Sequence, residues 1–350
     1  MVVIVDPGGH MYNGIKVLDV HAHVSVPTGA NATLVQLLGS NTPRTTSLLK
    51  AGKGLPPNFR ITDDDFRYSA AEHVKYIDDR NIDVQVIGPR PLNHMAWMQD
   101  HLLESWCREV NEMIYQQCMY HPDRFLGACQ LPLVSEYPDT SNVLPELRRC
   151  IEEYGFVATY VTPDPGGKRE TPGMHEAYWY PLYEECEERS IPIIVHATNV
   201  LDRRLRIIPQ NYQMAFYVEQ FFATQLLGHG DVFDRFPKIK FIICHCGGAL
   251  DRFVKGDPHL PSRDTTANLF FDTNAPEINY LTAAIRQKGV DQCCFGVEAP
   301  GSSRHPRPEN GVPGDDLVPV IAAFDWLTEE DKIKIFHDNP ARVIPQLGQV

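Results

Sequence analysis

The sequence lacks an apolar run long enough to cross a membrane, because none approaches the roughly 20 consecutive apolar residues that a spanning helix needs. Its first ten residues contain no cationic region, and their apolar stretch is shorter than the hydrophobic part of a secretory signal. These absences predict a cytoplasmic protein with no membrane partner.

Basic residues are also scarce, with 32 Lys and Arg against 45 Asp and Glu and a formal net charge of −13. No basic stripe is present, which argues against nucleic acid as a partner, since such binding depends on clustered Lys and Arg. The nine cysteines are odd in number and scattered, and several lie inside apolar runs. This distribution favours reduced core thiols over a disulfide framework.

Eight short apolar runs rich in Val, Ile and Phe are present, as expected for parallel strands covered by helices. The predicted strands are Ile15–Val20, Val84–Gly88, Phe125–Leu131, Phe156–Val161, Pro192–His196, Ile239–His245, Leu269–Asp272 and Cys293–Val297. Helical patterns alternate with them at His101–His121, Val143–Tyr154, Glu176–Arg189 and Gln213–Phe236. The alternation predicts an α/β fold, a distorted (β/α)8 TIM barrel. A doubly wound open sheet is the alternative, but no Gly-rich phosphate loop supports it.

Three segments interrupt this alternation, namely 27–65, Leu201–Tyr212 and Ala299–Asp315. No linker divides the chain, so we expect one domain over residues 1–350, with a cap insertion around 27–65 and loops covering the C-terminal face of the barrel. Near the end of the chain, Thr328 followed by Asp331 has the spacing of a helix-capping box. A final helix that closes the barrel is therefore predicted.

Four candidate metal ligands stand at predicted strand ends. His21 and His23 are two residues apart, a spacing that points both side chains to one face of a strand. His196 ends the fifth predicted strand, and Glu298 follows the eighth. Because the carboxyl ends of barrel strands surround one pocket, these side chains can converge on one ion. Three imidazoles and a carboxylate suit one divalent metal, Zn²⁺ first and Mn²⁺ as the alternative.

His245 ends the sixth predicted strand, and a pair of glycines follows it shortly afterwards. An imidazole titrates near neutral pH, so we expect general acid/base work, with metal ligation as the alternative. The flanking Cys244 and Cys246 could form a thiolate motif, but strand alternation predicts that they face away from the side of His245. Asp272, after the seventh predicted strand, could support a pocket histidine or only cap a loop.

Arginines follow three of the predicted strands. Arg90 follows the second, Arg206 lies in the segment after the fifth, and Arg304 in the segment after the eighth. The guanidinium group binds carboxylates through two parallel hydrogen bonds. An acidic chain with arginines on these loops predicts a small anionic carboxylate substrate. The alternative is that these arginines are only solvated charges on surface loops.

At these residues the sequence resembles the amidohydrolase superfamily, in particular its branch of metal-dependent decarboxylases and hydratases of carboxylated aromatics or their ring-cleavage products. The resemblance covers almost the whole chain and is carried by His21-Ala-His23, the stretch 231–238 that leads into the His245 strand, the loop at Glu298 and the motif Asp338-Asn-Pro-Ala-Arg342. It implies a distorted (β/α)8 barrel, a zinc or manganese centre and a homo-oligomer.

One position distinguishes activities within this branch. The decarboxylases carry an aspartate after the eighth strand, whereas this chain has Glu298, as the hydratases do. The resemblance implies a lyase that adds water to an oxo-acid with several carboxylates, formed when gallate and lignin-derived aromatics are degraded. It also implies that His21, His23, His196 and Glu298 hold zinc and that His245 moves a proton. Decarboxylation of a hydroxybenzoate-type acid and hydrolysis of an ester, lactone or amide remain alternatives.

Overall fold

The structure is a computed structural model that describes residues 11–27, 61–96, 98–198, 211–252, 263–301 and 303–350. Seven parallel strands lie in sequence order in one curled sheet. They are β1 (Leu18–His23), β2 (Val84–Gly88), β3 (Phe125–Gln130), β4 (Ala158–Val161), β5 (Ile193–Val195), β6 (Phe241–Ile243) and β7 (Leu269–Phe271). Consecutive parallel strands joined by helices are the pattern of a β/α barrel, and the doubly wound alternative is excluded.

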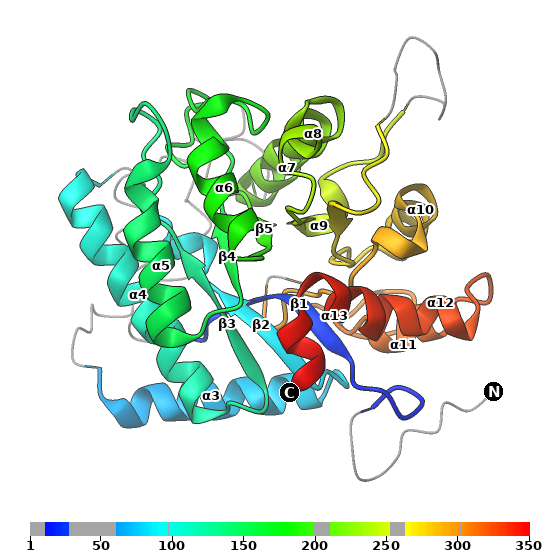
Figure 1. Ribbon diagram of the computed structural model, residues 1–350. Coiled ribbons are helices and arrows are strands. Elements are labelled where there is room, and N and C mark those ends of the chain that lie inside the picture. Colours follow the sequence, from blue (N-terminus) through cyan, green and yellow to red (C-terminus); the bar gives the residue numbers. More distant parts are fainter. Residues whose placement is uncertain (1–10, 28–60, 97, 199–210, 253–262, 302) are drawn as a thin grey trace.

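Helices surround the sheet on its outer side (Figure 1). They are α3 (Asp63–Asp78), α4 (Asp100–Tyr120), α5 (Leu144–Tyr154), α6 (Tyr180–Glu188), α7 (Asn211–His229), α8 (Val232–Arg235), α9 (Cys244–Gly247), α10 (Ile278–Lys288), α11 (Val318–Ala322), α12 (Glu329–Ile333) and α13 (Asn339–Val343). Thr328 forms the predicted capping box with Asp331 at the start of α12. In the part of the chain that the structure describes, no helix has the length and apolarity needed to cross a membrane.

The segment 293–298 closes the barrel, although it is not a regular strand. It forms a parallel bridge with β7, and Cys294 N donates to Phe271 O at 2.8 Å. On its other side, Val20 N donates to Phe295 O at 3.0 Å and Glu298 N donates to His21 O at 2.8 Å. The predicted eighth strand is therefore wrong as a regular strand but right in its place, between β7 and β1.

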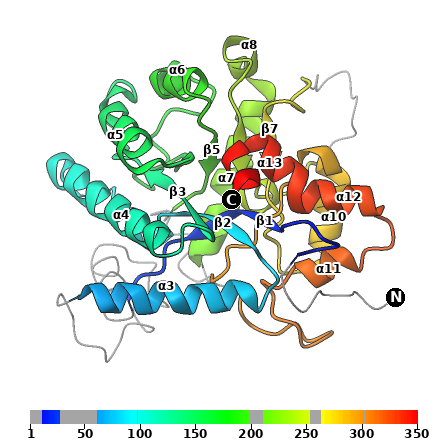
Figure 2. The ribbon, with the colours of Figure 1, turned by 60° about the horizontal axis from the view of Figure 1, so that its bottom comes forward.

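Two apolar layers form the core. Alternate strand residues such as Leu18, Val84 and Ile242 fill the barrel interior, and the other strand residues pack against the helices. Ile344 and Leu347 belong to the interior cluster, so the chain beyond α13 plugs the N-terminal end of the barrel. Figure 2 shows this segment over the middle of the strands. The other end of the barrel is left for polar side chains.

A β-bulge in β1 orients the histidine pair. The pairing of β1 with β2 shifts register between Asp19 and Ala22. Leu18 and Val20 belong to the interior cluster, whereas Ala22 packs in the outer layer. The extra residue shifts the alternation of the strand by one position. Val20 and His21 therefore both face the barrel interior, and His23 faces it as well. The two histidines lie inside β1, because the strand runs to His23 rather than ending at Val20 as predicted.

Most of the predicted cap, 27–65, lies outside the described residues, and only its last residues enter α3. The single-domain assignment with an inserted cap stays a prediction.

A substitution at Gly88 tests the packing of the barrel interior. A Cβ atom at Gly88 would lie 2.2 Å from Cε2 of Tyr160, which is buried at 1 % exposure. We expect Gly88→Ala to lower the free energy of unfolding by about 1–3 kcal/mol, because the ring has no room to move. Urea denaturation measures this. Gly228→Ala in α7, with no atom within 4 Å of the new Cβ, should keep or slightly raise the midpoint; equal midpoints in both variants would contradict this packing.

Candidate metal centre

The four predicted ligands converge at the C-terminal end of the barrel. One ligand atom from each of His21, His23, His196 and Glu298 lies within 4.8 Å of the others, and all four residues are buried. His23 Nε2 lies 3.1 Å and His196 Nε2 3.9 Å from Glu298 Oε1. Residues separated by more than 270 positions therefore share one small volume, large enough for a single cation.

Three ring nitrogens in this cluster have no hydrogen-bond partner although they are buried: Nδ1 of His23, whose Nε2 contacts Glu298 Oε1, and Nε2 of both His21 and His196. The opposite nitrogen of each ring is occupied, since His21 Nδ1 donates to Asp272 Oδ2 at 2.6 Å and His196 Nδ1 donates to Ala197 O at 2.8 Å. The Nε2 lone pairs are thus free. Unpaired buried acceptors are costly unless a cation or water takes them, so the donor set fits a divalent metal.

The charge state of the cluster suits the same ion. Burial, reinforced by the neighbouring histidines, lowers the pKa of His196 well below its usual value, so the ring is neutral. Burial alone would raise the pKa of Glu298, but its interactions with His23 and His245 outweigh burial and hold that pKa well below its usual range. Neutral imidazoles beside an ionised carboxylate are the protonation states that metal ligation requires.

Asp272, directly after β7, holds three segments of the site together. Its Oδ2 accepts from His21, and its Oδ1 accepts from the backbone N of Cys246 at 2.8 Å and of Asn274 at 3.1 Å. A carboxylate that orients a ligating imidazole in this way is a common support of metal sites. Of the two sequence-based interpretations of Asp272, support of a pocket histidine is therefore the better one.

His245 lies beside the cluster on the short turn α9, with a left-handed backbone at φ 53°. Its Nδ1 donates to Gln220 Oε1 at 3.0 Å, and its Nε2 lies 3.7 Å from Glu298 Oε2. The prediction that Cys244 faces away is wrong. Its Sγ lies within 4.8 Å of ligand atoms of His21 and Asp272. Cys244 follows the alternation and belongs to the interior cluster with Ile242, whereas the left-handed backbone of His245 breaks the alternation after it.

The arginines that follow the strands differ in position and contacts. Arg90 Nε donates to Val24 O at 2.7 Å, and burial lowers the pKa of Arg90 to about 10 while Glu298 opposes and Arg304 adds to the shift. Arg90 therefore lies within electrostatic reach of both Glu298 and Arg304. Arg206 lies outside the described residues. Arg307 donates to three backbone carbonyls and braces the loop that follows Glu298.

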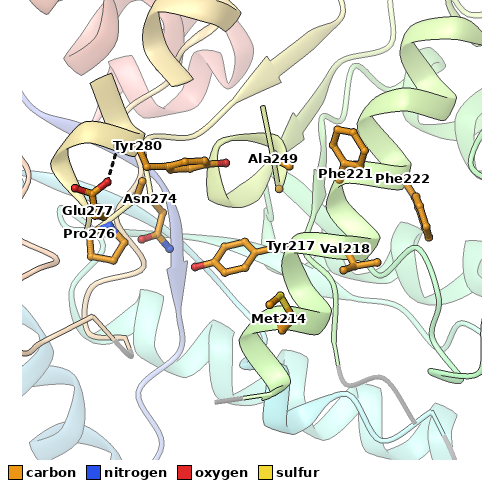
Figure 3. A pocket seen from close by; sticks show the side chains of 12 residues that line it. Met214, Tyr217, Val218, Phe221, Phe222, Ala249, Asn274, Pro276, Glu277 and Tyr280 are labelled. Carbon is orange, nitrogen blue, oxygen red and sulfur yellow. Dashed lines mark hydrogen bonds between the residues drawn. The ribbon is translucent and has the colours of Figure 1, made fainter. Parts of the chain in front are cut away.

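A cavity of about 610 Å³ lies between α7 and the start of α10, next to the cluster (Figure 3). Its lining is mostly apolar, but Asn274 in its wall donates to Glu298 Oε2 at 3.2 Å. Tyr217, also in the wall, lies edge-on to His245 with ring centroids 5.7 Å apart. Sequence reasoning missed Asn274, Tyr217 and Gln220. Only Asn274 carried a signal, since it follows Asp272 by two residues at a strand end.

The buried histidines make the metal-free protein sensitive to acid. Burial lowers the pKa of His23 to about 4, against 6.5 for an exposed imidazole. Between these values the unfolded chain binds a proton that the folded chain does not, so stability should fall as pH drops from 6.5 towards 4, by about 2 kcal/mol at pH 5. Urea denaturation of chelator-treated protein from pH 7.5 to 5 measures this. His23→Gln should flatten the dependence; an identical dependence in both proteins would refute it.

Comparison with known proteins identifies relatives of this chain. The amidohydrolase family model matches residues 18–346. A 2-keto-4-carboxy-3-hexenedioate hydratase from Sphingobium sp. is 30% identical over 95% of this chain and 97% of its own length. The crystal structure of 4-oxalomesaconate hydratase from Rhodopseudomonas palustris superposes with a TM-score of 0.77 at 29% identity, covering 95% of this chain and 97% of that one.

A gamma-resorcylate decarboxylase from Rhizobium radiobacter is 26% identical over 69% of this chain and 76% of its own length. The hydratases thus match more of the chain than this decarboxylase does. With a family model that spans nearly the whole sequence and a solved relative of the same distorted barrel, the chain belongs to the amidohydrolase family.

Proposed function

We propose that this protein is a metal-dependent hydro-lyase that adds water to a polycarboxylated oxo-acid such as 4-oxalomesaconate, in the degradation of gallate or related aromatics. The observation that carries the proposal is the buried cluster of His21, His23, His196 and Glu298, with three unpaired ring nitrogens, in a chain matched along its length by hydratases. The glutamate, rather than an aspartate, after the barrel-closing segment supports hydration over decarboxylation.

In this proposal His21, His23, His196 and Glu298 hold one divalent metal. The mixed nitrogen and oxygen donors favour Zn²⁺, with Mn²⁺ as the alternative. When bound, such an ion supplies a Lewis acid that polarises a substrate oxygen and acidifies water. Asp272 keeps the proton of His21 on Nδ1, so that Nε2 stays available as a ligand.

His245 is the proposed proton carrier. Its Nδ1–H donates to Gln220 Oε1, so Nε2, which lies 3.7 Å from Glu298 Oε2, is the nitrogen that can exchange a proton. A neutral imidazole in this tautomer can take a proton from water as it attacks, and return it to the substrate carbon. Asn274 donates to Glu298 Oε2 and fixes which carboxylate oxygen faces His23. Glu298 is therefore oriented for ligation, and for sharing the proton with His245.

Arg90 and Arg304 are the proposed anchors for substrate carboxylates. Arg90 is half-buried, which strengthens a guanidinium–carboxylate pair because water screens it less, whereas Arg304 is exposed. Arg206 remains a predicted third anchor outside the described residues. A homo-oligomer, the absence of a nucleic-acid partner and a cytoplasmic location remain predictions too.

Decarboxylation of a hydroxybenzoate-type acid is the second candidate. The observation that favours it is the cavity beside the cluster, which is lined by apolar and aromatic side chains suited to a ring. The gamma-resorcylate decarboxylase relative supports the same reading. The metal ligands and His245 would serve either reaction, so the substrate that the protein converts distinguishes hydration from decarboxylation.

Turnover of 4-oxalomesaconate tests the leading function. Purified protein should remove the ultraviolet absorbance of this conjugated oxo-acid, and elemental analysis of the same sample should find about one divalent metal per chain. Treatment with a chelator should abolish turnover, and added zinc should restore it. Metal without turnover, together with CO2 release from a hydroxybenzoate, would transfer the assignment to decarboxylation.

Two variants separate proton transfer from metal binding. His245→Asn should lower turnover by about 10²–10⁴-fold, the usual contribution of a general acid/base, while metal content stays near that of the parent protein. Glu298→Gln should lose both, because it removes a charged ligand. Metal content by elemental analysis and turnover are measured on the same preparations. Loss of metal in His245→Asn would make His245 a ligand instead.

A further inference from the structure

A buried chain of polar side chains lies on the outer face of β1 and β2, behind the metal cluster. It runs from Gln117 in α4 through His73 in α3 and Gln85 in β2 to Asp19 in β1. We propose that Gln85 is a positioning residue for the metal centre, which fixes the relative position of β1 and the Glu298 segment. This inference rests on the proposed metal site and deepens it.

The carboxamide of Gln85 joins two segments of the barrel. Gln85 is fully buried, and its Nε2 donates to Asp19 Oδ2 at 2.7 Å and to Ala299 O at 2.9 Å. Both amide hydrogens are thus used, one on each segment. A carboxylate at this position would offer neither. An apolar side chain would remove the donor to Asp19 Oδ2 and leave Ala299 O only His73 Nε2, at 3.2 Å.

Each of these acceptors is adjacent to proposed ligands. Asp19 Oδ1 accepts from the backbone N of His21 at 2.8 Å. This bond lies at the β-bulge of β1, where a side chain caps an N–H that an irregular ladder leaves without its usual partner. Ala299 directly follows Glu298, whose backbone is left-handed at φ 56°. One amide therefore connects the segments that carry three of the four proposed ligands.

The orientation of the Gln85 amide is itself determined by the chain of hydrogen bonds. Gln117 Nε2 can only donate, and it lies 2.8 Å from His73 Nδ1, so that nitrogen accepts. Burial lowers the pKa of His73 to about 3, so the ring is neutral and its single proton is on Nε2. Nε2 donates to Gln85 Oε1 at 2.9 Å. The amide nitrogen of Gln85 must then face Asp19 and Ala299.

The test compares Gln85→Glu with Gln85→Met, an apolar variant that buries no second carboxylate beside Asp19. Asn268→Asp is the matched control, because Asn268 is also buried and its amide also donates two hydrogen bonds, here both to backbone carbonyls, at the opposite end of the barrel. Each protein is loaded with Co²⁺. Its visible absorption spectrum, its Co²⁺ dissociation constant by competition with a chelating dye, and its urea midpoint are measured.

We expect both Gln85 variants to bind Co²⁺ about 10–100-fold more weakly than the parent, the usual effect of losing an outer support of a metal site, and to show shifted d–d bands when saturated. Asn268→Asp should lower the urea midpoint without changing the spectrum or the affinity. A folded Gln85 variant with the parent's spectrum and affinity overturns the proposal. Parent protein that binds Co²⁺ but does not hydrate 4-oxalomesaconate contradicts only the proposed function; parent protein that binds no Co²⁺ overturns both.

Discussion

The buried carboxylate of Glu298 is the constraint on which the arrangement of the barrel mouth depends. An ion removed from water costs several kcal/mol unless nearby groups compensate it. Here His23 from β1, Asn274 after β7 and His245 after β6 approach its two oxygens. These three elements must end at the same depth for the carboxylate to be compensated. The register of the barrel and the geometry of the metal cluster are therefore set together.

The strand ends could be predicted from the sequence because a buried parallel strand is a short, continuous apolar run. The run Val84–Gly88 became β2 with the same bounds. The run at 293–297 did not become a regular strand, since Phe295 N donates to Ile335 O, 40 residues further along the chain, instead of to a neighbouring strand. An apolar pattern records burial but not the partner of each backbone group, so this irregularity has no local signal.

The candidate site was predictable as a set of ligand types at strand ends, and the structure brings His21, His23, His196 and Glu298 together. Their role as metal ligands stays a prediction. The reason that the first two share a face was only partly foreseen, because a bulge rather than plain alternation turns His21 inward. The side of Cys244 escaped prediction for the same kind of reason, since the left-handed backbone at His245 breaks the alternation directly after it. The supporting residues Gln220 and Gln85 resemble ordinary polar residues in sequence, and only tertiary contacts reveal their partners.

The plug formed by Ile344 and Leu347 has a consequence for how the protein is made. These side chains complete the same interior cluster to which Leu18 of β1 belongs. A ribosome releases the chain from its N-terminus, so the first strand emerges long before the residues that cover its inner face. The barrel interior therefore remains incompletely packed until residues 344–347 have also been synthesised. During that time the apolar inner face of β1 lacks the side chains that cover it in the folded barrel.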